Sequence, residues 1–334
     1  MRPSPKEGRV RYVDKCKNSA RTLASRRALL IGALAQPLLV TRDTLPHAAA
    51  LAAAAPAPLR DVNSLRDVVQ STLAVADDGR TPLELALRPS YSIETRDVLY
   101  PEWFVGRWKV KSTLCQVLAP AGDFFFSPGR NGTAALRRAR LEMSAPPLEY
   151  ECRWRREPDG SVVVDRGYNV ASISKAALGA RAVQDVAEDG ADHVTLVIAP
   201  GGAPKGLLYR CDLRVVARHS EATGEATCAA ASARCRFDCA ETVRQTITVV
   251  PGEAVSVGTQ PPAVKEVETI CLYESRPDGS INGYQRTSTF LVPDAAYTAE
   301  SPLVEQQAAR MLRARDGRMV ATDVRTYMLE YTRA

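Results

Sequence analysis

The stretch from Tyr100 to Val110 constrains the fold of this chain more than any other. It reads Tyr-Pro-Glu-Trp-Phe-Val-Gly-Arg-Trp-Lys-Val, which places a proline and a glycine just before an alternating segment. Pro101 has no amide hydrogen for a sheet ladder, and Gly106 permits close approach of another group. From Trp108 onward apolar and polar residues alternate, as in a half-buried strand. The stretch therefore predicts the first strand of an antiparallel sheet.

The first 54 residues have the composition of a targeting sequence. Residues 1–27 hold nine Lys or Arg and two acidic residues, which is typical of an organellar transit peptide. Arg26 and Arg27 precede the apolar run 28–40, and a small-residue tract with Ala-x-Ala cleavage options follows. This order predicts a twin-arginine export signal over 28–54.

Together the two segments predict delivery to the lumen of the thylakoid in a chloroplast. A secretory or bacterial export signal with a long N-terminal region is the alternative. A membrane anchor is disfavoured, because the apolar run 28–40 is shorter than the roughly 20 residues that a spanning helix needs.

The targeting sequence also accounts for the basic charge. The whole chain has a net charge of +6, from 44 Lys+Arg and 38 Asp+Glu. Residues 1–54 contain ten of the former and three of the latter, so 34 basic and 35 acidic residues remain. A near-neutral mature protein offers no support for nucleic-acid binding, and no nucleic-acid motif is present.

The remaining chain divides into an N-terminal helix with a connector, residues 55–97, and a large domain, residues 98–334. Two Pro-Asp-Gly turns, at 158–160 and 277–279, predict β-hairpins. Many short strands with few helices favour a mainly β fold, and an antiparallel barrel removes exposed strand edges. Helices are expected at 64–76, 169–178 and 303–314, and a loop at 119–147. Strands are expected at 108–118, 148–154, 161–165, 193–198, 207–218, 243–250, 264–273, 284–292 and 320–331.

The triplet Gly106-Arg107-Trp108 resembles the Gly-x-Trp signature of the lipocalin-like (calycin) barrels. In that superfamily the tryptophan lies at the closed end of the barrel, and an arginine from the last strand packs across its ring. The resemblance implies that Arg325 or Arg333 takes this place through cation–π attraction.

The fuller motif Tyr-Pro-x-Trp-Phe-x-Gly-x-Trp, with Asp165-Arg166-Gly167-Tyr168-Asn169, resembles an uncharacterised family of cyanobacterial and plastid proteins. Its members are described only as a domain of unknown function. The resemblance covers most of residues 98–333, and an apparent insertion at about 220–240 departs from it. It implies no ligand and no reaction.

Three consecutive aromatic residues, Phe124, Phe125 and Phe126, follow the first predicted strand. Lipocalin-like barrels fold a lid over the open mouth at this position. The three rings either form such a lid, in contact with an apolar ligand, or plug the core. Both interpretations stay open at this stage.

Seven cysteines follow the leader, and an odd number leaves at least one of them free or bonded to another chain. Cys115, Cys152, Cys211 and Cys271 fall in predicted strands, where cysteine acts as a small buried hydrophobe. Cys228, Cys235 and Cys239 lie in or beside the apparent insertion, and a disulfide between two of them is the first interpretation. A zinc site with His219 is disfavoured by the spacing.

The motifs of common enzyme classes are missing. The sequence contains no Gly-x-Ser-x-Gly, no Walker loop, no Gly-x-Gly-x-x-Gly and no His-Glu-x-x-His. We therefore expect a non-catalytic protein without metal or cofactor, which binds a hydrophobic small molecule such as a pigment, quinone or lipid. The alternative is an assembly or interaction factor for photosynthetic membrane complexes, with a barrel filled by side chains.

Overall fold

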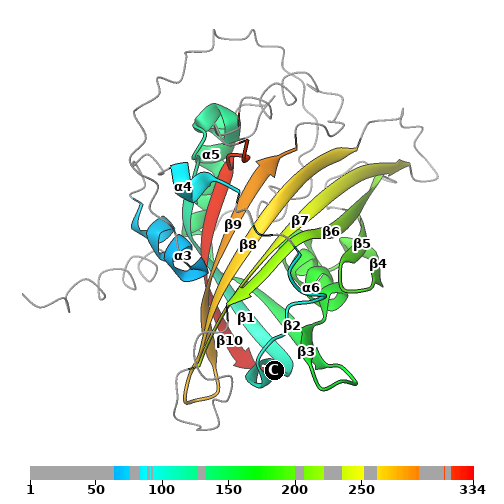
Figure 1. Cartoon of the computed structure of the whole chain (residues 1–334). Helices are drawn as coiled ribbons and strands as arrows, with labels where there is room; N and C mark the ends of the chain where they lie inside the picture. Colours follow the sequence, from blue (N-terminus) through cyan, green and yellow to red (C-terminus); the bar gives the residue numbers. More distant parts are fainter. Residues whose placement is uncertain are drawn as a thin grey trace, which may run out of the picture.

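A computed structural model describes most of the chain beyond the leader. It covers residues 64–75, 83–88, 91, 93–126, 132–199, 207–221, 235–251, 262–292, 312 and 317–334. One strongly curled sheet dominates the molecule, with short helices at its outer side, at one end and in its opening (Figure 1). The mainly β, antiparallel fold expected from the sequence is confirmed.

The sheet has ten strands in the order β3-β2-β1-β10-β9-β8-β7-β6-β5-β4, and each neighbouring pair is antiparallel. The first and last long strands pair in the middle of the sheet, so the sheet cannot form until both ends of the domain have been synthesised. The strands are β1 (Gly106–Leu118), β2 (Leu148–Arg156), β3 (Val162–Val164), β4 (Val183–Asp189), β5 (His193–Ile198), β6 (Leu207–Glu221), β7 (Arg236–Pro251), β8 (Ala263–Ser275), β9 (Ile281–Leu291) and β10 (Asp323–Arg333).

The edge strands β3 and β4 do not pair with each other, so the sheet forms a half-barrel. Helix α6 (Arg166–Leu178) connects these two strands and packs against β2, β4 and β5. Its Asn169 and Ser172 side chains accept hydrogen bonds from the backbone N–H groups of Arg153 and Glu151 on β2. The helix therefore covers strand edges that a closed barrel would pair, which differs from the expected strand-to-strand closure.

Both Pro-Asp-Gly segments form the expected hairpin turns, between β2 and β3 and between β8 and β9. Gly160 and Gly279 have φ values of 88° and 78°, a region that glycine adopts without steric cost. Asp159 and Asp278 each accept a hydrogen bond from the backbone N–H two residues later. The local chemistry of these turns is sufficient to form them.

The outer side of the sheet is covered by the N-terminal segment. Helix α3 (Leu65–Ala74) begins at Ser64, whose hydroxyl accepts a hydrogen bond from Asp67 N at 3.1 Å. Leu65 and Val69 pack against Ala240, Ile270 and Leu272 of β7 and β8. The short helix α4 (Leu83–Ala86) extends this cover in the region expected to be a plain connector.

Other boundaries differ from the sequence expectations. The expected loop at 119–147 contains the 3-10 helices η2 (Asp123–Phe126) and η3 (Glu142–Ser144) with α5 (Gly132–Leu141) between them. A further 3-10 helix, η1 (Glu102–Phe104), precedes β1, and β4 was not expected. The helix expected at 303–314 falls almost wholly outside the described residues. Within the described ranges, the search for a helix with the length and hydropathy of a membrane span finds none.

Candidate functional site

The inward face of the half-barrel begins with Trp108 near the start of β1. Trp108 lies opposite Arg333 of β10 and Cys152 of β2 in the strand registers. Its side chain is buried, and its Nε1 donates a hydrogen bond to Phe104 O at 2.7 Å. The Arg333 guanidinium lies 3.9 Å from the ring centroid. Arg333 is therefore the arginine that packs on the tryptophan, whereas Arg325 lies elsewhere.

Gly106 makes room for this arrangement. Its φ is +113°, and an added Cβ would lie 2.8 Å from the Arg333 Nη1 atom. Arg333 also donates hydrogen bonds to the carbonyl oxygens of Val105 and Trp103. The glycine, the tryptophan and the arginine thus form one unit in which any larger side chain at 106 would displace the guanidinium.

Aromatic rings fill the inward face around Trp108. Phe104 and Tyr100 pack edge to face at 5.0 Å between centroids, and Phe104 meets Tyr273 in the same way at 4.9 Å. We call this cluster the closed end; its inward members are buried: Phe104, Trp108, Trp154, Phe237, Tyr273 and Tyr331. No ligand fits there without moving these rings.

A layer of thiols lies next to the closed end. Cys239 of β7 and Cys271 of β8 face each other in register, and both are buried free thiols. A hydrogen bond with Cys271 and burial raise the pKa of Cys239 well above its ordinary value. Cys235, four residues before Cys239, is disulfide-bonded. Cys239 therefore takes no part in the expected disulfide, and Cys228 falls outside the described residues.

Beyond the thiol layer the inward side chains change character. Alternate residues of a strand share a face, so Thr269, Val267 and Lys265 of β8 follow Cys271 along the inward face. They are partly exposed, and so are their inward neighbours on β7 and β9. We call this set the open end: Val243, Gln245, Lys265, Val267, Thr269, Gln285, Thr287 and Thr289.

Three charged outward side chains of β8 and β9 are buried. Glu266 and Glu268 of β8 and Arg286 of β9 are each at most 2% exposed. The N-terminal segment covers them, since Arg88 pairs with Glu266 at 2.9 Å and the Tyr91 hydroxyl donates to Glu268 at 2.7 Å. At the open end the usual pattern is therefore reversed, with a buried outer face and a partly exposed inner face.

Charged groups gather where the open end meets β10. Burial lowers the pKa of Lys265 to about 8, which is well below the ordinary value for lysine. Burial also raises the pKa of Asp323, which accepts a hydrogen bond from Arg325 at 3.0 Å. Arg325 pairs with Glu142 of η3 at 3.4 Å as well. These groups supply one amine and one satisfied ion-pair network to the inner face.

The three aromatic residues of the expected lid have different surroundings. The Arg325 guanidinium lies 5.8 Å from the ring centroid of Phe126, so Phe126 lies beside the open end. Phe125 packs with Ala86 and Leu312 in a separate apolar cluster. Phe124 is 46% exposed. Of the three rings, Phe126 alone has a contact with a residue of the inward face that the structure describes.

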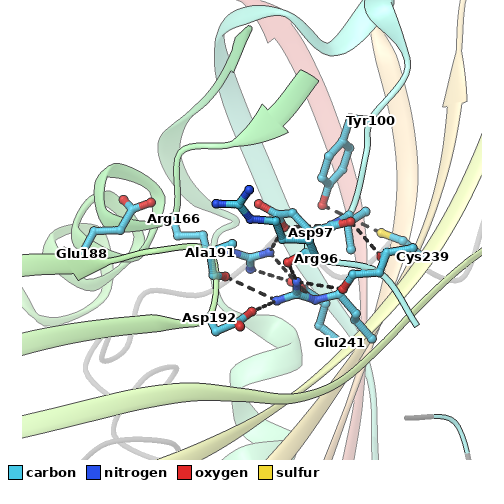
Figure 2. Close-up of polar contacts among 12 residues, drawn as sticks. Arg96, Asp97, Tyr100, Arg166, Glu188, Ala191, Asp192, Cys239 and Glu241 are labelled. Atoms are coloured by element: carbon cyan, nitrogen blue, oxygen red, sulfur yellow. Dashed lines mark hydrogen bonds and ion pairs between the residues drawn. The ribbon is translucent and has the colours of Figure 1, made fainter. Parts of the chain in front are cut away.

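A second cluster, which we call the clasp, consists of Asp97, Arg166, Asp192, Arg218 and Glu241; Figure 2 labels all of these residues except Arg218. Arg166, the first residue of α6, donates to Asp97 at 2.5 Å and to Glu241 at 2.7 Å. Arg218 is fully buried, pairs with Asp192 at 2.5 Å and lies 3.5 Å from Glu241. The clasp ties α6 and the connector before β1 to β6 and β7.

The clasp is an electrostatic closure of the half-barrel. Burial alone would lower the pKa of Arg166, but the carboxylates of Glu241 and Asp97 raise it. Arg218 also donates to the backbone carbonyls of Thr95, Arg96 and Ala191. Because its charges are mutually satisfied, the clasp holds the elements together rather than presenting a free acid or base. No motif or spacing in the sequence indicates this cluster.

The other polar residues considered in the sequence have structural contacts. Asp165 begins α6 and accepts a hydrogen bond from Tyr168 N at 3.0 Å. His193 lies 3.6 Å from Asp212, and His219 stacks on Tyr91 beside Glu94. Among the residues that the structure describes, no three His, Cys, Asp or Glu side chains form a group that could hold a metal ion.

Fold and site together define a one-sheet antiparallel half-barrel, with a closed aromatic end, an open end and a helix in its gap. A family model described as a domain of unknown function, DUF6816, matches residues 92–316, and the chain belongs to this family. Neither the search of curated proteins nor that of solved structures returned a match. The matched segment stops before β10, although β10 pairs with both β1 and β9.

Proposed function

We propose that this chain is a non-catalytic lipocalin-like protein that binds a hydrophobic small molecule at the open end of its half-barrel. The observation that carries the proposal is that on β8 and β9 the inward side chains are more exposed than their outward neighbours. Their inward residues, such as Val267 and Thr287, are partly exposed, while their outward neighbours Glu268 and Ser288 are buried. Inward side chains that keep part of their surface exposed leave room for contact with a ligand.

The chemistry of the open end favours an amphipathic molecule within this class. Val243 and Val267 offer apolar surface, while Thr269 and Thr287 offer hydroxyl groups. A ligand that lies along these strands would contact both kinds of side chain. A quinone or a lipid, which has a polar head and an apolar tail, matches that lining better than a pure hydrocarbon.

A lipophilic fluorescent dye and a short-chain quinone test this proposal. We expect the folded protein to enhance the fluorescence of anilinonaphthalene sulfonate and the quinone to displace the dye. Val267→Trp should abolish both effects, because its indole would occupy the open end. Thr332→Trp, on the exposed outer side of β10, is the matched control and should leave binding unchanged. Equal dye binding by the two variants would contradict the proposal.

A second candidate function is an assembly or interaction factor for photosynthetic membrane complexes. The observation that favours it is the exposure of Ile93 and Leu99, at 50% and 56%, on the connector before β1. Exposed large apolar side chains are typical of contact surfaces. Capture of photosystem subunits by the native protein, lost in Leu99→Ser while the dye-binding assay is unaffected, would favour this function over ligand binding.

The proposed place of action is the thylakoid lumen. The support is the order of the basic segment 1–27 and the twin-arginine signal 28–54, which both lie outside the described residues. In a chloroplast import assay we expect Arg26→Lys with Arg27→Lys to stop the protein in the stroma. Delivery of this variant to the lumen, or failure of the unchanged chain to enter the chloroplast, would contradict the proposed address.

A further inference from the structure

The helix α5 presents an unusual surface at the end of the half-barrel (Figure 1). Leu136 and Ala139 are buried in the main apolar cluster and hold the helix in place. Leu141 at its C-terminal end is 68% exposed, and Phe124, whose backbone touches the helix N-terminus at Gly132, is 46% exposed. Among the described residues, these are two of the four large apolar side chains that are exposed.

The same surface is strongly basic. Arg137, Arg138 and Arg140 are exposed, and α5 contains no acidic residue. Glu142, which follows the helix, is turned inward to Arg325, and its side chain is only 10% exposed. Asp123 of η2, which packs against α5, is an exposed acid of this surface. The charge of this surface is therefore net positive.

The helical geometry interleaves the two kinds of side chain. At about 100° per residue, Arg137 and Arg138 lie on either side of Leu141 on the helix circumference, and Arg140 lies further round. Leu136 and Ala139 point the other way, into the core. Arginines on either side of an exposed apolar side chain combine the two contacts, one with anionic headgroups and one with acyl chains, that bind peripheral helices to a membrane interface.

We propose that α5 and η2 dock the protein on the surface of a membrane that contains anionic lipid. Leu141 and Phe124 enter the headgroup region, and Arg137 and Arg138 contact lipid phosphates. Charge complementarity commits this surface to an anionic bilayer rather than a neutral one. This inference goes beyond the proposed function and stands without it. Since Phe126 of the same segment lies by Arg325, docking brings the open end to the lipid surface.

Vesicle flotation tests this proposal. The protein used is a chain that begins at residue 55, which keeps every described helix and strand and removes the basic leader. We expect it to float with vesicles of phosphatidylcholine and phosphatidylglycerol in equal parts, but not with phosphatidylcholine alone. Binding should weaken as salt is raised, because salt screens the arginine charges.

Matched variants locate the surface. Arg137→Gln with Arg138→Gln should weaken binding to the anionic vesicles about 30-fold, at about fivefold per arginine. Lys109→Gln with Lys111→Gln removes the same charge from the exposed outer side of β1 and should change binding less than twofold. Leu141→Ala should weaken binding about fivefold and Phe124→Ala by a similar factor.

Two results would overturn the proposal. One is an equal loss of binding in the arginine and lysine double variants, which would mean that total charge rather than α5 decides the interaction. The other is a folded protein that floats with neither kind of vesicle. Circular dichroism of each variant should match that of the unchanged protein, because all the replaced side chains are exposed.

Discussion

The closed and open ends are built from the same strands but differ in what surrounds the inward side chains. At the closed end Trp108, Phe104 and Tyr331 pack against one another and are at most 3% exposed. At the open end Lys265, Thr269 and Thr287 are partly exposed, although they continue the same alternation. A β-sheet thus fixes which side chains face inward, but the size and chemistry of those side chains decide whether the interior is filled.

The difference also shows where the polar residues belong. The closed end uses aromatic rings and one surface arginine, so its hydrogen-bonding groups are few. The open end carries an amine, hydroxyl groups and a salt-bridge network, which cost free energy when they are removed from water without partners. We therefore expect substitutions at the two ends to have different consequences, and four predictions follow in order of size.

The largest effect is expected for Trp108→Ala. Truncation of this buried tryptophan should reduce the free energy of unfolding by about 3–5 kcal/mol, because the ring leaves a void that the closed end cannot refill. Urea denaturation of the unchanged and variant proteins measures it. Ligand affinity should be the same once the variant is folded. A stable variant that had lost ligand binding would move the binding site to the closed end.

A change of opposite sign is expected for Lys265→Met. The folded pKa of Lys265 is about 8, against 10.5 for an ordinary lysine, so the unfolded chain binds more protons between these values. Stability of the unchanged protein therefore rises from pH 8 to pH 10.5, and below pH 8 the amine is charged although its desolvated surroundings disfavour the charge.

The methionine variant should be more stable by about 2 kcal/mol at pH 7, and the difference should shrink as the pH rises toward 10.5. Denaturation series at several pH values measure this difference between the two proteins. Lys109→Met, on the exposed outer side of β1, should show no such trend. If the free energies of unfolding of the unchanged and Lys265→Met proteins changed in parallel with pH, the Lys265 amine would be in contact with water.

A smaller loss is expected for Arg333→Met at the closed end. It removes the guanidinium above Trp108 and the hydrogen bonds to Val105 O and Trp103 O, which together contribute about 1–2 kcal/mol. Tryptophan fluorescence should change in this variant. Arg325→Met should leave that fluorescence unchanged, since Arg325 contacts Phe126 and Glu142 instead. If only Arg325→Met changed the fluorescence, Arg325 rather than Arg333 would be the arginine that packs on Trp108.

The smallest effect is expected for Thr287→Val at the open end. Its partly exposed side chain has little packing to lose, so the stability should change by no more than about 0.5 kcal/mol. Leu329→Ala, a buried inward residue on β10, should cost about 2–4 kcal/mol by the same denaturation measurement. Similar costs for the two variants would mean that both ends are filled.

The sequence was most informative where structure depends on neighbouring residues. The two Pro-Asp-Gly turns, the N-terminal helix after Ser64 and most strands follow from turn chemistry and alternation. The sequence did not predict helix α5, because its buried face consists of only Gly132, Leu136 and Ala139. So few apolar positions give no clear helical periodicity. The three arginines and the glycine of this segment are also typical of a loop.

Alternation also failed at irregular points of the sheet. A register shift between Val215 and Ala217 of β6 reverses which residues face inward, so Arg218 joins the clasp. By parity with Arg214, which is exposed, it would face outward. A β-bulge inserts one residue into one strand only, and the sequence of that strand alone does not reveal it. The pairing of Arg218 with Glu241 therefore could not be predicted from the sequence.

By itself the sequence determined the class of the fold and the turns, while the resemblance to lipocalin-like barrels left two candidates, Arg325 and Arg333, for the arginine that packs on Trp108. Arg325 and Arg333 both face inward by alternation, which is a local property of β10. The tertiary structure decided that Arg333 reaches the ring, that α6 closes the gap and that the inward side chains of the open end stay partly exposed. These outcomes depend on register and on contacts between residues far apart in the chain, and local periodicity carries no information about either.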